Sequence, residues 1–189
     1  MRPWKTLSSK VVLDRPPFLV VEEHTVETPK GKVVEGWSWI VTPDYVITVA
    51  IDKQGRYLAL HESHYGTEGD CFSPPGGHID LGEEPLESAK RELLEETGYQ
   101  AINWQFLGRF RTDLNRGNGM GWYYLVTGAE KIRLPDDQDL EEHELVLLER
   151  EQLVEMLQTN QIKEITSQAA FLMSLAVENR QILDHHLFS

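Results

Sequence analysis

Cysteine is nearly absent from this 189-residue chain, and long apolar runs are missing altogether. The single cysteine, Cys71, cannot form an intrachain disulfide, which suits a reducing compartment. The opening MRPWKTLSSK has no apolar core of the kind that a signal peptide carries. No segment approaches the roughly 20 apolar residues of a membrane-spanning helix. We therefore expect a cytoplasmic protein with no membrane partner.

Positive charge is also scarce. Lysine and arginine number 18 against 31 aspartates and glutamates, which gives a net charge of −13. A nucleic-acid backbone needs a basic surface, so nucleic acid is not an expected partner. A small anionic substrate is compatible with this charge, because bound divalent cations reverse the local field. The chain length and the 40% hydrophobic fraction suit one domain with a small appendage.

Carboxylates recur at helical spacing in the middle of the chain. Glu92, Glu95 and Glu96 stand at i, i+3 and i+4 of a predicted helix, so their side chains share one face. Magnesium prefers carboxylate oxygens and completes its shell with substrate phosphates. The alternative is an ordinary solvated acidic face. The cluster favours chemistry on a diphosphate.

A longer motif surrounds these carboxylates. It reads Gly, five residues, Glu, seven residues, Arg-Glu, an aliphatic residue, any residue, Glu-Glu, any residue, Gly and an apolar residue. The matching positions are Gly77, Glu83, Arg91, Glu92, Leu93, Glu95, Glu96, Gly98 and Tyr99. This motif resembles the Nudix box of the Nudix hydrolases, which cleave nucleoside diphosphates linked to another moiety. Only Tyr99, an aromatic residue, departs from the usual aliphatic type.

The resemblance implies a set of metal ligands and a set of supporting residues. Metal ligation by Mg²⁺, or Mn²⁺ in its place, is expected from Glu92, Glu95, Glu96 and the backbone carbonyl of Gly76. Glu83 and Arg91 are expected to brace the loop against the helix, a supporting role that fixes the geometry of the ligands. The alternative for this pair is an ordinary surface ion pair.

A further glutamate follows from a second likeness. The segment EEHELVLLEREQL is similar to one that supplies a mobile active-site glutamate in ADP-ribose and nucleotide-sugar pyrophosphatases. Alignment on the strand that follows places Glu141 at that position. The alternative is an exposed acidic loop. The candidate catalytic residues are thus Glu92, Glu95 and Glu141, and the sequence leaves open which of them is the general base.

Three residues are candidate substrate contacts. Trp37, together with Trp4, matches aromatic residues that sandwich a base in that subfamily, although burial at a dimer interface is the alternative. His64 stands where relatives often carry a phosphate-binding arginine. Arg116 lies in the glycine-rich stretch 115–119, a predicted flexible loop, and could bind phosphate or sugar. A solvated loop arginine is its alternative reading.

The order of predicted elements fits the same family. Strands are expected at 11–13, 18–26, 33–41, 46–51, 57–61, 101–110, 122–126 and 145–148, and helices from the box to about 99, at 150–157 and at 162–179. We expect an α/β protein with a Nudix-type α/β/α sandwich around a mixed sheet and a small N-terminal antiparallel β extension. Residues 1–42 would form the extension, which builds a homodimer in the similar subfamily, and residues 43–189 the Nudix hydrolase domain.

The expected reaction is hydrolysis of the pyrophosphate bond of an ADP-ribose-like nucleoside diphosphate, which yields a nucleoside monophosphate and a phosphorylated partner. A non-catalytic nucleotide-sugar sensor and a Nudix hydrolase of nucleoside triphosphates or dinucleotides are the alternatives. An isomerase of isoprenoid diphosphates would need a reactive cysteine. Cys71 has no cationic activator near it in the sequence, so we predict a buried, inert thiol.

Overall fold

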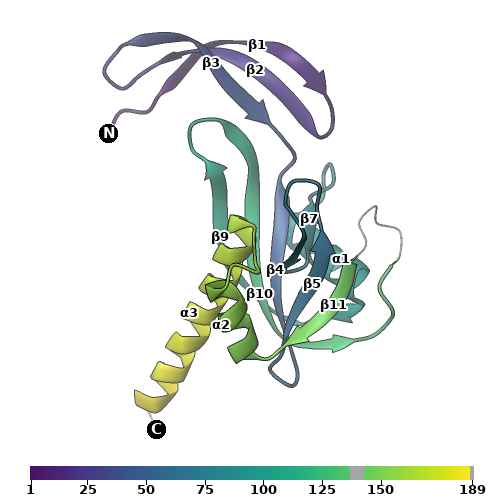
Figure 1. Cartoon of the computed structure of the whole chain (residues 1–189). Coiled ribbons are helices and arrows are strands. Elements are labelled where there is room, and N and C mark those ends of the chain that lie inside the picture. The colour runs from purple at the N-terminus through teal and green to yellow at the C-terminus, as the bar shows by residue number, and fades with distance from the viewer. Residues whose placement is uncertain (137–142, 188–189) are drawn as a thin grey trace. The chain divides into compact units, whose positions relative to one another are not determined.

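The computed structural model describes residues 1–136 and 143–187, with side chains to residue 180 (Figure 1). Its internal contacts divide the chain into two compact units. The first, the N-terminal unit, comprises Met1–Tyr45 and Phe110–Gly121. The second, the box unit, comprises Val46–Arg109 and Trp122–Ser189 and contains the whole Nudix-like motif.

The first segment of the N-terminal unit folds into a three-stranded antiparallel meander. Its strands are β1 (Lys5–Arg15), β2 (Leu19–Glu27) and β3 (Val33–Val41). β1 begins earlier than the predicted strand at 11–13, because its polar first half still pairs with β2, with one register shift between Thr6 and Ser8. A turn joins β2 to β3 and is closed by a hydrogen bond from Gly31 N to Thr28 O of 2.8 Å.

The prediction of a flexible loop at residues 115–119 is wrong. A short turn joins β9 (Asn103–Asp113) to β10 (Gly117–Lys131), so Gly117 already belongs to a strand. The turn is fixed to β3, because Ile40 N donates to Arg116 O at 2.8 Å. Gly117 has φ +83°, and a side chain there would meet the Trp39 indole. Its glycine therefore permits a close approach of two strands and does not mark disorder.

The box unit is built on a sheet whose central order is β10-β4-β5-β11. β4 spans Tyr45–Asp52, β5 Tyr57–Ser63 and β11 His143–Leu148. Shorter strands extend it: β6 (Asp70–Ser73) pairs with β5, β7 (Gly76–His78) with β4, and β8 (Tyr99–Gln100) with β10. β6, β7 and β8 were not predicted, because strands this short show no periodicity in the sequence.

Helices cover both faces of this sheet, as predicted. Leu58 faces α1 (Pro85–Thr97), where it shares a buried cluster with Leu93. Its neighbour Tyr57 points to the other face and meets Phe171 of α3 (Ile165–Leu187), with ring centroids 6.5 Å apart. α2 (Arg150–Gln158) precedes α3. No helix within the described residues is long and apolar enough to cross a membrane.

Helix α1 begins and ends at residues whose backbone geometry suits those positions. Pro85 is its first residue, where the missing N–H costs no hydrogen bond. Gly98 follows its end in the left-handed conformation, φ +73°, and donates to Leu94 O at 3.0 Å. Ala89 and Leu93 are fully buried against the sheet. The opposite face of α1 is thereby left to the glutamates.

Candidate metal centre

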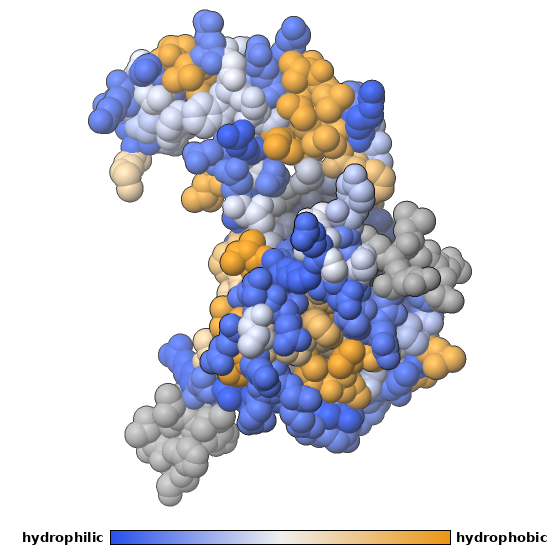
Figure 2. Space-filling view, viewed as in Figure 1, coloured by the Kyte–Doolittle hydropathy of each residue, from blue (hydrophilic) through white to orange (hydrophobic). Residues whose placement is uncertain are grey.

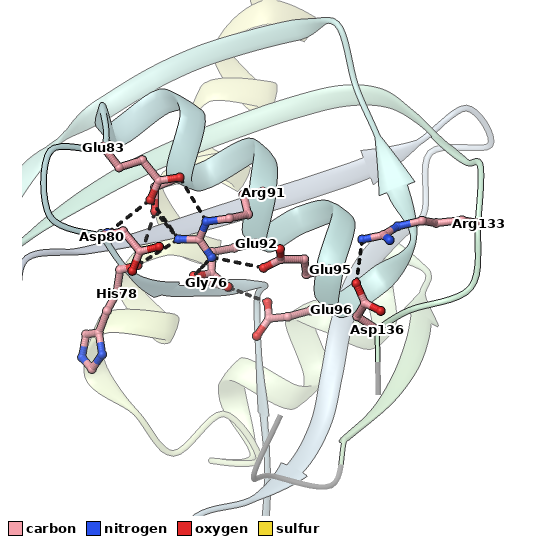
Figure 3. A network of polar contacts seen from close by, with 11 residues as sticks. Gly76, His78, Asp80, Glu83, Arg91, Glu92, Glu95, Glu96, Arg133 and Asp136 are labelled. Atoms are coloured by element: carbon pink, nitrogen blue, oxygen red, sulfur yellow. Dashed lines mark hydrogen bonds and ion pairs between the residues drawn. The ribbon is translucent and has the colours of Figure 1, made fainter. Parts of the chain in front are cut away.

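The glycines that precede the box lie directly against its carboxylates. Gly76 N donates a 2.8 Å hydrogen bond to Glu96 Oε2 (Figure 3). A Cβ atom placed on Gly77 would lie only 2.6 Å from Glu92 Cδ, so any side chain here would displace the Glu92 carboxylate. Strand β7 and the acidic face of α1 therefore form two walls of one site.

Arg91 links these carboxylates to the loop before the helix. Its Nε and Nη2 donate to the two oxygens of Glu83, at 3.0 and 2.9 Å, in a bidentate pair. Nη1 donates to Glu92 Oε1 at 2.8 Å and to Glu95 Oε2 at 3.1 Å. Nη2 also reaches the carbonyl of His78 at 3.2 Å. Figure 3 shows the guanidinium between Glu83 on one side and Glu92 and Glu95 on the other.

The Arg91–Glu83 pair stays charged over a wide pH range. Hydrogen bonds from Arg91 lower the pKa of Glu83 to about 2, and burial opposes this shift. The hydrogen bond to Glu83 raises the pKa of Arg91 above its ordinary value, helped by the charge of Glu92. Because Arg91 is only 28% exposed, the pair is not an ordinary solvated surface contact.

The donors of this site fit a hard divalent cation. All of them are oxygens, which Mg²⁺ and Mn²⁺ prefer, and glycine at 77 keeps space for the Glu92 carboxylate. The two glutamates differ in solvent exposure, since the side chain of Glu92 is 13% exposed and that of Glu95 is 39% exposed. With Arg91 holding two of the glutamates and Gly76 the third, their oxygens do not form a group within 4.8 Å of one another.

The segment that carries Glu141 is attached to this helix at both of its ends. Asp136 N donates to the carbonyl of Glu95 at 2.7 Å. On the far side of the segment, His143 Nε2 lies 3.2 Å from the carbonyl of Glu96 and can donate to it. Glu141 itself lies outside the described residues. Its two flanks thus meet the backbone of two box glutamates.

The three candidate substrate contacts belong to different units. His64 follows β5 in the box unit, with Nε2 2.9 Å from Glu62 Oε1. Trp37 and Arg116 lie in the N-terminal unit. The Trp37 indole packs against Trp4, with centroids 5.4 Å apart, and donates to the carbonyl of Asn115 at 2.8 Å. Arg116 forms an ion pair with Asp113 at 3.6 Å.

Glu62 is a residue of this unit that sequence reasoning overlooked. It stands in the strand YLALHES, where Leu58 and Leu60 alternate with it on the face turned to α1. Its side chain is 8% exposed and lies beside His64. The sequence did contain a signal for Glu62. The alternation of inward- and outward-facing side chains along this strand predicts an apolar residue at position 62, and an acidic residue stands there.

Replacement of Gly77 by alanine tests the two-walled site. The added methyl group must push the Glu92 carboxylate aside, which is a flexible side-chain end, so the fold should survive while cation binding weakens about tenfold. Mn²⁺ binding, followed by the electron paramagnetic resonance of free Mn²⁺, measures the change. Gly66→Ala is the matched control, since no atom lies within 4 Å of its Cβ position. Equal affinities in the two variants would contradict the close approach of Gly77 and Glu92.

Two family models match the chain. The NUDIX domain matches residues 41–169, and the nucleoside diphosphate sugar hydrolase N-terminal domain matches residues 4–40. Among curated proteins, an ADP-ribose pyrophosphatase of Bacillus subtilis is 30% identical over 141 residues, which are 72% of this chain and 75% of that protein. A CMP-5'-(N-acetyl-N-hydroxy-3-aminopropyl)phosphonate hydrolase of Streptomyces rubellomurinus is 30% identical over 134 residues. That match covers 71% of this chain but less than two thirds, 64%, of the Streptomyces protein.

A solved structure has the same fold. The crystal structure of an ADP compounds hydrolase superposes with a TM-score of 0.79 at 20% identity and covers 96% of this chain and 97% of its own. The expected α/β/α sandwich is confirmed by this likeness. Because the NUDIX model spans more than half of the chain and its motif lies on α1 and the loop before it, the chain belongs to the Nudix family.

Proposed function

We propose that the protein hydrolyses the pyrophosphate bond of a nucleoside diphosphate linked to a sugar or a similar group, with Mg²⁺ or Mn²⁺ as cofactor. The products are a nucleoside monophosphate and a phosphorylated partner. The observation that carries this proposal is the site formed by β7 and α1, where Glu92 and Glu96 face two glycines and Arg91 ties Glu92 and Glu95 to the preceding loop.

Each residue of this site has a task in the reaction. Glu92, Glu95, Glu96 and the carbonyl of Gly76 hold the cations. When bound, divalent cations offset the charge of the pyrophosphate oxygens and acidify a coordinated water. Arg91 and Glu83 fix the orientation of the ligand side chains, because their bidentate pair joins the loop to the helix.

One carboxylate must accept the proton of the attacking water. We propose Glu141 for this role, with Glu92 and Glu95 as the alternatives. Support for Glu141 comes from its flanks, since Asp136 and His143 both contact carbonyls of α1. His64 is proposed to donate to a substrate phosphate, Trp37 to contact the base, and Arg116 to contact phosphate or sugar.

A substrate panel tests this function. ADP-ribose, CDP- and UDP-sugars, a CMP-linked phosphonate, NADH, dinucleoside polyphosphates and nucleoside triphosphates would each be incubated with Mg²⁺ and with Mn²⁺. Chromatography should show a nucleoside monophosphate released from at least one linked diphosphate. Tight binding of a nucleotide sugar without any product would favour the sensor, and cleavage of triphosphates alone would favour the second alternative. The panel contains compounds of the kinds named for both curated relatives, because those names specify different nucleosides and leaving groups.

We also propose a cytoplasmic homodimer, with residues 1–42 as the dimerisation extension and residues 43–189 as the catalytic domain. Strand β1 is exposed along its whole length and presents apolar side chains, among them Leu7, Val11 and Val12, each about half exposed. Figure 2 shows apolar surface over the strands of the N-terminal unit.

Light scattering tests the dimer. The measured mass should be twice the chain mass, and Val11→Asp should shift it toward the mass of the monomer. A monomeric wild-type protein would contradict the dimer.

A further inference from the structure

Two adjacent strands bring three different ligand types together in the box unit. Glu62 of β5 stands directly opposite Cys71 of β6 in the antiparallel register. His64 follows β5, two residues after Glu62. The ligand atoms of these three side chains all lie within 4.8 Å of one another. Among the described residues, no other group of three or more His, Cys, Asp or Glu side chains converges in this way.

The three side chains form a partly enclosed cluster. Glu62 is 8% exposed in its side chain, Cys71 is 5% exposed, and His64 is 38% exposed. His64 Nε2 lies 2.9 Å from Glu62 Oε1, and Ser73 Oγ donates to the same oxygen. Cys71 Sγ points at the Glu62 carbonyl from 3.7 Å, a long contact for a thiol donor. Solvent therefore reaches the cluster from the His64 side.

A buried carboxylate at this position is not explained by the fold. Leu58, Leu60 and Glu62 share one face of β5, and Leu58 belongs to the apolar cluster beneath α1. A third apolar side chain would extend that packing, whereas a buried charge is costly unless it is paired. We therefore attribute the acidic side chain of Glu62 to its neighbours His64 and Cys71.

We infer that Glu62, His64 and Cys71 form a second cation site, selective for a borderline transition metal such as Zn²⁺ or Co²⁺ and distinct from the box. A thiolate, an imidazole and a carboxylate are the ligands that these ions take, while Mg²⁺ prefers an all-oxygen site. Tetrahedral Zn²⁺ needs donor atoms about 3.3–3.6 Å apart, which small side-chain rotations provide. Three protein ligands leave a fourth position, on the side where His64 is exposed.

The surroundings of the thiol determine its state in the metal-free protein. Burial raises the pKa of Cys71, and the charge of Glu62 adds to that shift. The thiol is therefore protonated and unreactive in the metal-free protein, as the sequence predicts for a buried cysteine. On coordination its proton passes to solvent and the thiolate becomes the ligand. The site shares no ligand with the box, although His64 is also the proposed phosphate donor, so Co²⁺ binding is measured without substrate and its failure leaves the proposed hydrolysis untouched.

Cobalt spectroscopy tests this site on the full chain. Co²⁺ would be titrated into the metal-free protein in the presence of excess Mg²⁺, which competes for the oxygen ligands of the box. Cys71 is the sole thiol, so a thiolate-to-Co²⁺ charge-transfer band must come from this residue. We expect the band to saturate at one Co²⁺ per chain, with visible bands typical of tetrahedral coordination. A wild-type protein that gives no charge-transfer band overturns the proposal.

Three variants show whether the other two ligands take part. His64→Ala and Glu62→Gln should each weaken Co²⁺ binding at least about tenfold, the low end of the loss caused by outer-sphere changes. His61→Ala is the matched control, because His61 stacks on Phe72 at 4.6 Å and lies on the other face of β5. It should bind like the wild type. Circular dichroism establishes that each variant is folded, and unchanged affinity in both His64→Ala and Glu62→Gln would also overturn the proposal.

Discussion

Glu96→Gln should lower kcat/KM at least about 100-fold while the fold remains intact. Glu96 is a proposed cation ligand, and the loss of a direct ligand should exceed the 10–100-fold cost of losing an outer-sphere partner. The amide oxygen of glutamine can still accept the hydrogen bond from Gly76 N, so the contact between β7 and α1 is retained. Steady-state kinetics with the best substrate of the panel, at several Mg²⁺ concentrations, would measure the loss.

The same exchange elsewhere on the helix is the control. Glu87 lies on α1, is 61% exposed and pairs with Lys90 at 2.7 Å on the surface, away from the proposed ligands. Glu87→Gln therefore removes one negative charge from the same helix without touching the proposed ligands, and it should retain activity within about twofold. Near-normal activity of Glu96→Gln would contradict the assignment of this side chain, and equal losses in both variants would point to general electrostatics.

Arg91→Ala should lower the free energy of unfolding by about 2–4 kcal/mol at neutral pH. The substitution leaves Glu83, Glu92 and Glu95 near one another without their shared cation, and removing one member of a largely buried ion pair is strongly destabilising. Urea unfolding followed by tryptophan fluorescence measures the change. Lys90→Ala is the matched control, since the neighbouring Lys90 pairs with exposed Glu87, and its cost should stay within about 0.5 kcal/mol.

The pH dependence of the unfolding free energy distinguishes the loss of the Arg91–Glu83 ion pair from the loss of packing around Arg91. The pKa of Glu83 falls from its ordinary value of 4.5 to about 2 on folding, so the folded chain binds fewer protons in this range. The resulting stabilisation is fully present above about pH 5 and is lost as the pH falls toward 2. It amounts to about 2–3 kcal/mol after allowance for partial exposure. The stability difference between wild type and Arg91→Ala should shrink over this window, and a constant difference would contradict the pairing.

Sequence reasoning succeeded where a feature is encoded locally. The box helix begins at Pro85 and ends before Gly98, because each residue favours its position through its own backbone geometry. The approach of Arg91 to Glu83 follows from the same helix and the loop directly before it. The family assignment also rests on this one continuous motif, which the NUDIX match contains.

Features that depend on pairing between distant segments could not be predicted from the local sequence. The glycines at 115–119 predict flexibility, yet backbone contacts to β3 fix the turn. Nothing in the sequence shows that Glu62 and Cys71 are neighbours, and only the β5–β6 register places them opposite one another. The roles of Trp37, His64, Arg116 and Glu141 stay predictions, because they concern contacts with a substrate.

The sequence by itself determined the chemical type of the site, since carboxylates spaced along one helical turn share a face whatever surrounds the helix. The tertiary structure decided what those carboxylates meet, namely the backbone of Gly76 and the space left by Gly77. It also decided that a thiol, an imidazole and a buried carboxylate converge on neighbouring strands. The physical reason is that helical spacing is fixed by the local backbone, whereas strand register is set by packing of the whole sheet.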